Sequence, residues 1–373
     1  MKKMKSMAGI LAILVLVLTM MACNGNPDNK AGETDSGASG ETSASEDQVF
    51  NWKASFGGTP GTFQSEGYVK LCEWIKEYTD GTVNIEYYPG GTLVTDPESV
   101  AALQENTVQI AHSAVTLMEP TIHSLGVLAV PGMIRPDRFF EYAYGLRDAL
   151  NQETEPYGIK VLLPTPTGYV CFPSSTGIYK KPSDLNGENV RVAGKIVGDT
   201  VQAWGGNPVT IASNEMVTAL ERGTVKTAYV GDITLCDSWK LYEIVPYITE
   251  TTIGEVISFA CMSMEAWDQL SENQKNGVNK AVDEYARWIE EAANAFRTEY
   301  EQKLVDNGNE IYALTDAEGK AFVDPALEIG IPSAIESGGE NAEKLADLCE
   351  KLRDYADNNP YEPGKIPSFD WLK

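Results

Sequence analysis

Apolar and polar residues alternate along the chain from Asp47 onward with two periods, one typical of strands and the other of helices. Up to Ala114 a strand-like run is followed by a helix-like run and the order then repeats, which predicts a βαβαβ unit. Its first helix is expected to follow an N-cap at Thr62 and to end near Tyr78, where Thr79-Asp80-Gly81 closes it. The pattern favours an α/β protein with largely parallel sheets.

A second α/β unit is predicted from about residue 165 to 262. Short strand-like runs again alternate with helical runs, with strands expected at 189–192, 207–211 and 227–230 and helices at 197–204 and 214–222. A strand is also expected at 158–163, and a short one in the 170s. We therefore assign 48–165, with later segments that return to it, to a first α/β domain and 166–262 to a second.

The region 263–306 has a different pattern. From Glu265 to about Asp306 apolar residues recur mainly every three or four positions, which predicts one helix, or a short helix joined to a long one of about 45 Å. A helix that long can lie across two small domains and set the angle between them. We interpret its aromatic residues as core packing. Residues 307–373 are expected to hold C-terminal helices, one of them at 342–358, and an extended tail.

The first 22 residues are typical of a signal peptide. Three lysines precede an apolar stretch from Met7 to Ala22, which is shorter than the roughly 20 residues of a membrane-spanning helix. The run Leu18-Thr-Met-Met-Ala-Cys23 resembles a bacterial lipobox, which implies that Cys23 carries lipid and becomes the mature N-terminus. A simple cleaved signal and a signal anchor are the alternatives.

Residues 23–47 are rich in Gly, Ser, Thr, Asp and Glu and have almost no apolar side chains. Such a segment buries too little surface to offset the entropy of ordering it, so a flexible tether is expected. A tether behind a lipid anchor implies a protein that works at the outer face of a membrane, or in a periplasm if an outer membrane exists.

Composition excludes several classes of function. The chain has 29 Lys and Arg against 54 Asp and Glu, a formal charge of −25, and such a surface repels nucleic acid. Two histidines, His112 and His123, leave little material for histidine-based metal or triad chemistry. The sequence contains no nucleophile elbow, Walker loop, zinc-protease motif or dinucleotide fingerprint. We expect no catalytic residue, metal site or cofactor, and binding is favoured over catalysis.

The six cysteines form no CxxC pair, so neither a zinc ribbon nor a complete disulfide framework is indicated. Cys72 and Cys349 lie in amphipathic helical patterns and are interpreted as small core residues. A bridge from Cys236 to either Cys171 or Cys261 is left open, because spacing alone supports neither.

Arg191 stands out on physical grounds. It lies between Val190 and Val192 in a short strand of the buried type, so alternation places it on the face opposite the two valines. If that face borders a cleft, the guanidinium fork suits a carboxylate, which it can hold through two parallel hydrogen bonds. The alternative is a half-exposed strand arginine paired with a surface glutamate.

An ordered series of motifs resembles a known family. Pro89-Gly-Gly-Thr-Leu93 followed by a helix, Val127-Leu-Ala-Val-Pro131, Pro182-Ser-Asp-Leu-Asn-Gly-Glu-Asn-Val-Arg-Val192, Asn214–Gly223 and Lys240–Tyr247 are similar to segments of TRAP (tripartite ATP-independent periplasmic) transporter solute-binding proteins of the DctP type. The resemblance covers residues 50 to about 330. No single motif is decisive, but their order and approximate spacing are specific.

The resemblance implies an α/β fold forming a two-domain, periplasmic-binding-protein-like clamp with a long helix across both domains and the ligand between them. It also implies that Arg191 binds the carboxylate of a small organic acid. The liganded clamp would then be delivered to a membrane permease that uses an ion gradient rather than ATP. The expected location is extracytoplasmic, with Cys23 inserted into membrane lipid.

The sequence also departs from the family pattern. Many sialic-acid and C4-dicarboxylate binders of the family have a second arginine, but its place here is occupied by Val170–Cys171. Ser213 takes the place of a frequent aromatic residue, and Val230 takes the place of a frequent asparagine. These changes favour a monocarboxylate with a less polar body. Further ligand contacts are predicted from position alone, at Phe56, Gly57, Ser113, Cys171, Ser213, Tyr229 and Val230.

Two other functions remain as alternatives. One is a ligand-sensing binding protein that presents its ligand to a membrane receptor. The other, of a different class, is a secreted enzyme with an unrecognised active site.

Overall fold

The computed structural model describes residues 47–58, 60–232, 239–367 and 369, and for residues 213 and 214 the backbone only. The predicted signal peptide, the tether and Cys23 lie outside the described residues. Cys236 does too, so both disulfides considered from the sequence remain untested. Cys72 and Cys349 are buried in the main hydrophobic core, which confirms their assignment as core residues.

The predicted N-terminal βαβαβ unit is confirmed. Strand β1 pairs in parallel with both β2 and β3. The side chain of Thr62 caps the first helix, with its hydroxyl oxygen accepting a hydrogen bond of 3.2 Å from the backbone N–H of Ser65. We call this group of elements the first lobe: β1 (Phe50–Phe56), α1 (Phe63–Tyr78), β2 (Val83–Pro89), α2 (Ser99–Gln104) and β3 (Ile110–Ala114).

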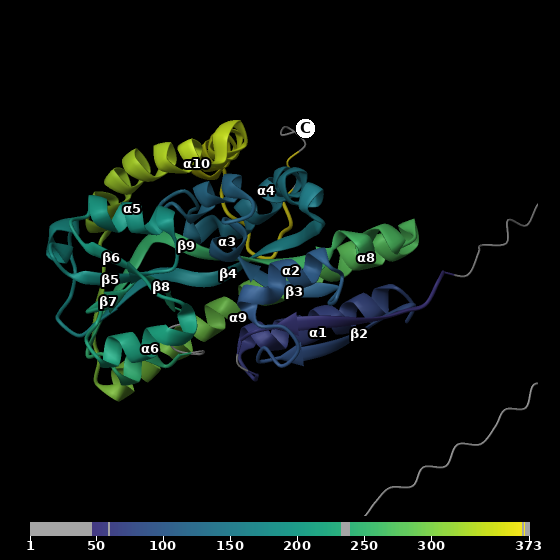
Figure 1. Cartoon of the computed structure of the whole chain (residues 1–373), viewed down its shortest axis with the longest axis horizontal. Coiled ribbons are helices and arrows are strands. Elements are labelled where there is room, and N and C mark those ends of the chain that lie inside the picture. Colours follow the sequence, from purple (N-terminus) through teal and green to yellow (C-terminus); the bar gives the residue numbers. More distant parts are fainter. Residues whose placement is uncertain (1–46, 59, 233–238, 368, 370–373) are drawn as a thin grey trace, which may run out of the picture. The chain divides into compact units, whose positions relative to one another are not determined.

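A second group of elements follows the predicted alternation to within a few residues. Strand β5 pairs in parallel with β6 and β7, and β8 pairs with β4. We call this group the second lobe, and it lies at the opposite end of the sheet from the first lobe (Figure 1). It comprises β5 (Asn189–Val192), α5 (Lys195–Ala203), β6 (Asn207–Thr210), α6 (Ser213–Glu221), β7 (Thr227–Ala228) and β8 (Val230–Gly231).

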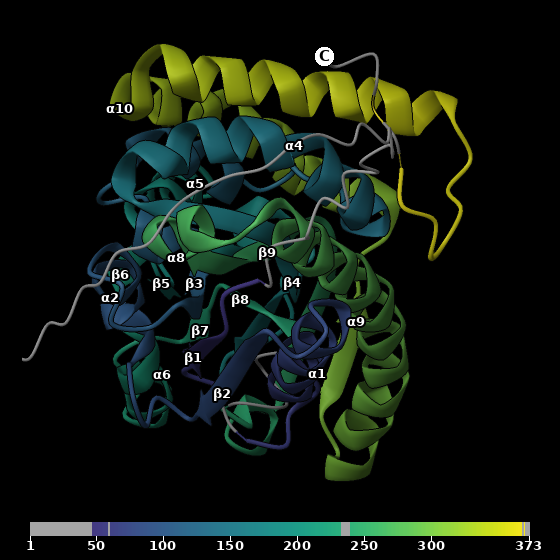
Figure 2. The same cartoon turned by 90° about the vertical axis from the view of Figure 1, so that its right-hand side faces the viewer.

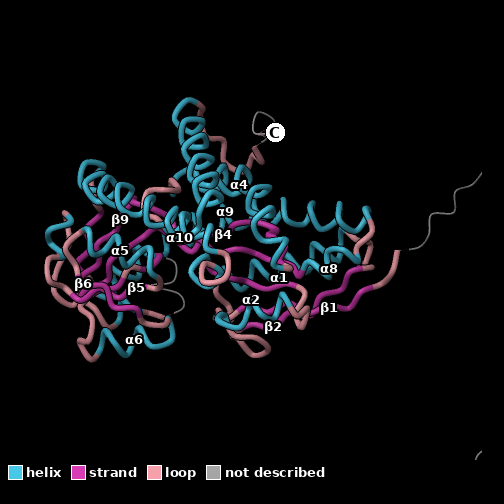
Figure 3. The backbone as a smooth tube through the Cα atoms, turned by 45° about the horizontal axis from the view of Figure 1, so that its top comes forward, coloured by secondary structure: helices cyan, strands magenta, loops and turns pink. Residues whose placement is uncertain are grey.

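Two long antiparallel strands join the lobes: β4 (Ile159–Ser174) and β9 (Tyr247–Ser263). The main strand order is β2-β1-β3-β9-β4-β7-β5-β6, and β9 pairs antiparallel with both β3 and β4, so the sheet is mixed and not largely parallel as expected. Figure 3 shows β1 and β2 toward one end of the sheet and β5 and β6 toward the other. Two short strands were expected where β4 is continuous, because Pro164, Pro166 and Gly168 suggest breaks. The strand accommodates them through register shifts between 161 and 163 and between 166 and 168.

The pattern after residue 263 forms a short helix joined to a long one, which is one of the two predicted alternatives: α8 (Met264–Gln269) and α9 (Glu272–Asn307). The first half of α9 packs against α1, and Tyr285 lies in the main core (Figure 2). Its second half contributes Phe296 and Tyr300 to a separate core under the second lobe. The helix therefore ties the two lobes together, and the predicted packing role of these aromatic residues is confirmed.

The remaining helices cover the sheet on the side of α5. The long α10 (Asp316–Asn358) bends at Gly339, whose backbone is not helical, and the predicted helix at 342–358 is the part after this bend. The other elements are α3 (Val115–Met118), α4 (Phe139–Thr154) and β10 (Glu310–Ala313), which pairs with β9. None of the described helices has the length and apolar content needed to cross a bilayer. The domain limits at 165 and 262 stay predictions.

Candidate ligand-binding site

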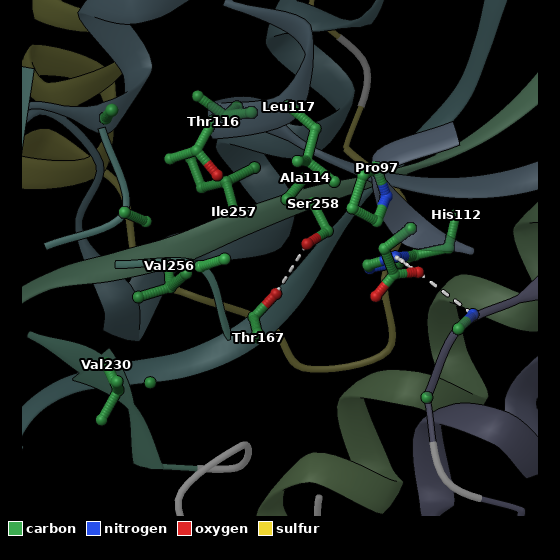
Figure 4. Close-up of a pocket in the computed structure, with 18 of the residues that line it drawn as sticks. Pro97, His112, Ala114, Thr116, Leu117, Thr167, Val230, Val256, Ile257 and Ser258 are labelled. Carbon is green, nitrogen blue, oxygen red and sulfur yellow. Dashed lines mark hydrogen bonds and ion pairs between the residues drawn. The ribbon is translucent and has the colours of Figure 1, made fainter. Parts of the chain in front are cut away.

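A cavity of about 530 Å³ is lined by residues of both lobes and of the two strands that join them. In Figure 4, Pro97 and His112 of the first-lobe side face Val230 of the second, and Thr167 of β4 and Ser258 of β9 lie between them. The hydroxyls of Thr167 and Ser258 are hydrogen-bonded at 2.9 Å. A mainly apolar cavity with a few placed polar groups is typical of small-molecule binding sites.

Arg191 lies on the second-lobe wall of this cavity. Val190 and Val192 point into the core on the other face of β5, as the alternation predicts, while Arg191 itself is only 3% exposed. Its Nε donates a hydrogen bond of 2.9 Å to the carbonyl oxygen of Ile211, which orients the guanidinium. Burial lowers the pKa of Arg191 to about 10, so the group keeps its charge at neutral pH. The arginine is thus buried at the cavity rather than half-exposed on the surface.

Four of the other residues predicted from the sequence line the same cavity: Phe56, Gly57, Tyr229 and Val230. Phe56 and Gly57 belong to the first lobe, and the other two belong to the second. The structure therefore brings together residues that lie more than 170 positions apart in the sequence. Whether they contact a ligand remains a prediction.

Two predicted residues are placed elsewhere. Ser113 is fully buried in β3, where its hydroxyl accepts a hydrogen bond of 3.2 Å from Ser99, and it is not among the described cavity-lining residues. Cys171 lies in the core under the second lobe, opposite Val230 in the β4–β8 pair, and does not line the described cavity either. The side chain of Ser213 lies outside the described part of the structure.

Sequence reasoning missed Asp96, which lies on the first-lobe wall. Its Oδ1 accepts a hydrogen bond of 3.1 Å from the backbone N–H of Gly57 and lies 3.8 Å from Nδ1 of His112. Burial raises the pKa of Asp96, but His112 and the Gly57 N–H outweigh burial, and the pKa is lowered. A Cβ at position 57 would lie 2.2 Å from Oδ1, so only glycine allows this approach.

Glu255 of β9 is a second acidic group that the sequence did not reveal. Its Oε1 accepts a hydrogen bond of 2.6 Å from the backbone N–H of Gly168. Burial and the nearby Asp232 raise the pKa of Glu255 well above its ordinary value, against the opposing effect of Arg297. Arg297 forms an ion pair of 3.0 Å with Asp232. These surroundings therefore make the carboxyl group of Glu255 harder to ionise than that of an exposed glutamate.

Glu250, near the start of β9, should make the stability of the protein depend on pH. Burial, then Glu301 and Asp232, raise its pKa to about 7. At a pH between the pKa of Glu250 in the unfolded chain and its pKa of about 7 in the folded protein, the folded protein binds this proton and the unfolded chain does not. The free energy of unfolding therefore falls as the pH rises toward about 7, where the folded protein also loses the proton. Glu250→Gln should raise the melting temperature more at pH 8 than at pH 5, as measured by calorimetry.

The exposed Glu310 of the neighbouring strand β10 is the control for this experiment. Glu310→Gln should change the melting temperature by similar amounts at both pH values. An equal shift at pH 5 and pH 8 in Glu250→Gln would contradict the assigned effect.

The region that builds the cavity matches a family model described as DctP, bacterial extracellular solute-binding protein, family 7, over residues 55–329. That span is well over half of the chain and includes the second lobe and the first lobe from the end of β1 onward. The chain belongs to this family. Its mixed α/β fold is the two-domain clamp of the DctP-family solute-binding proteins, as the sequence predicted.

Curated relatives of this DctP-family protein have related but different ligands in their names. The C4-dicarboxylate-binding periplasmic protein DctP of Rhodobacter capsulatus is 24% identical over 75% of this chain and 85% of its own length. The ectoine-binding periplasmic protein TeaA of Halomonas elongata is 21% identical over 80% of this chain and 88% of its own. The members are solute-binding proteins rather than enzymes.

A solved structure agrees in fold. The TRAP periplasmic solute-binding protein of Desulfovibrio salexigens with bound orotic acid has a TM-score of 0.75 and 20% identity, and the match covers 82% of this chain and 99% of the other. Likeness at this identity establishes the fold of the DctP-family protein. The ligand must be argued from the cavity itself.

Proposed function

We propose that this DctP-family protein is the extracytoplasmic solute-binding component of a TRAP transporter. It captures a small organic acid with a single carboxylate through Arg191 and delivers it to a membrane permease, while Cys23 anchors it in lipid. The observation that carries the proposal is a buried, charged arginine on the wall of a cavity that both lobes build. The names of the relatives, which include periplasmic binders of dicarboxylate and ectoine, support a small charged solute.

The binding mechanism follows from desolvation. Closing the clamp on a carboxylate would remove water from the ion pair, and each charge-assisted hydrogen bond then contributes about 1.5–3 kcal/mol. Phe56, Tyr229 and Val230 supply apolar wall against the rest of the ligand. A ligand with a single carboxylate is favoured because this chain lacks the second arginine that many dicarboxylate binders of the family have. Its place falls at Val170 and Cys171, which are uncharged and buried.

Mass spectrometry of the small molecules released on denaturing the purified protein tests this function. The expected compound carries a carboxylate, rebinds to the stripped protein with one-to-one stoichiometry by calorimetry, and is recovered chemically unchanged after prolonged incubation. A released ligand without an acidic group would contradict the proposal. Conversion of the ligand during incubation would favour an enzyme instead.

A further inference from the structure

The charges that face the cavity are unevenly distributed between its walls. Among the described lining residues, Arg191 is the one lysine or arginine, and it belongs to the second lobe. The ionised carboxylate of Asp96 lies on the first-lobe wall. The binding site therefore has a positive and a negative wall.

The carboxylate of Asp96 is fixed through one of its two oxygens, and the other oxygen can accept a hydrogen bond from a ligand. Its Oδ1 accepts the Gly57 N–H and lies 3.8 Å from Nδ1 of His112, while none of the described residues donates a hydrogen bond to Oδ2. The side chain is 42% exposed, and it lines the cavity. Pro97, the next residue, lies in the 3-10 turn Asp96–Glu98, and its ring restricts the backbone of this wall. A carboxylate with an open oxygen is thus presented to whatever fills the cavity.

The two charged groups belong to opposite sides of the binding site. In the sheet, β9 and β4 separate the first-lobe strands from β7 and β5, which carries Arg191. Figure 4 shows Pro97, next to Asp96, on one side of the Thr167–Ser258 pair and Val230 on the other. A ligand whose acid group is held by Arg191 and that spans the cavity therefore places its far end at Asp96.

The chemistry of that far end follows from electrostatics. A second carboxylate would face the like charge of Asp96, which costs several kcal/mol at a closed interface. An apolar end would remove water from Asp96 without replacing the hydrogen bonds that the water made to the carboxylate, and this loss also weakens binding. A cationic nitrogen can donate a charge-assisted hydrogen bond to Oδ2 of Asp96 and so replaces the lost water.

We infer that the ligand is a small zwitterion, in which Arg191 binds the carboxylate and Asp96 binds a cationic nitrogen at the far end. The inference rests on the proposed function and deepens it by naming the ligand class. It assigns Asp96 a role in specificity that keeps dicarboxylates out. The single carboxylate of the proposed function is retained, and a basic nitrogen is added to it.

Two matched series of probes test the inference by calorimetry on the stripped protein. The short series is 4-aminobutanoate, pentanoate and glutarate, and the longer one is 4-(aminomethyl)benzoate, 4-ethylbenzoate and 4-(carboxymethyl)benzoate. Within each series only the far group changes, from ammonium to methyl to carboxylate. In at least one series the ammonium compound should bind about tenfold or more tightly than the other two, equivalent to about 1.4 kcal/mol.

Asp96→Asn keeps an oxygen that can accept the Gly57 N–H but removes the charge. It should abolish the preference for the ammonium compound, and the methyl compound should bind more tightly than to the parent because a neutral amide costs less to desolvate than a carboxylate. Glu105→Gln removes a charge from an exposed side chain at the end of α2, outside the cavity, and should retain the preference. Persistence of the preference in Asp96→Asn would overturn the inference.

The outcomes separate this inference from the proposed function. If methyl or carboxylate compounds bind as tightly as ammonium compounds, or if the released native ligand is a carboxylate without nitrogen, the zwitterion is wrong while the organic-acid binder stands. If no probe binds and the released ligand has no carboxylate, both are wrong. A released ligand with one carboxylate and one basic nitrogen would support both.

Discussion

Arg191→Ala is expected to weaken binding of the released native ligand by about 100- to 10,000-fold. Two charge-assisted hydrogen bonds at roughly 1.5–3 kcal/mol each contribute about 3–6 kcal/mol, and every 1.4 kcal/mol is tenfold in affinity. The loss should be large because Arg191 is 3% exposed, so water cannot easily replace the guanidinium in the closed site. Calorimetric titration of the stripped variant measures the effect.

Two further variants make this result interpretable. Arg222→Ala removes an exposed arginine at the end of α6 and should bind as the parent does. Arg191→Lys keeps a positive charge but loses the planar fork, so its affinity should fall between those of the parent and the alanine variant. Circular dichroism establishes that each variant is folded. Unchanged affinity in a folded Arg191→Ala protein would disprove the proposed anchor.

Gly277→Leu is expected to destabilise the protein by about 3 kcal/mol or more, at the upper end of overpacking effects. Gly277 lies where α9 crosses the end of α1, and a Cβ there would be 2.3 Å from the carbonyl oxygen of Tyr78. Because that atom belongs to the backbone, the two helices would have to separate. The change should lower the melting temperature, and denaturant unfolding monitored by circular dichroism gives the free energy.

Gly177→Leu is the matched control. Apart from Gly177 itself and its two chain neighbours, no described atom lies within 4 Å of a Cβ at this position, and its backbone does not have the positive φ that favours glycine. Its stability should stay close to that of the parent. If the two variants were equally stable, the close approach of α9 to α1 would not constrain position 277.

The elements predicted best are those whose signals are local. Thr62 caps α1 through the backbone of a residue three positions away, and the apolar period of α9 is contained in one continuous segment. Arg191 was identified because its two valine neighbours showed which face of β5 it occupies. Strand β9 was missed because its residues are buried on nearly every position, so it lacks the polar alternation of a half-exposed strand.

By itself, the sequence determined the alternating helices and strands, the long helix and the single arginine of the site, because periodicity and capping act over a few residues. Only the tertiary structure decided how the cavity is charged. Asp96 meets Gly57 across 39 positions, and Glu255 meets Gly168 across 87. Carboxylates are abundant in this acidic chain, and no local pattern distinguishes these two from the rest. Folding places both carboxylates beside backbone N–H groups that lie far away in the sequence.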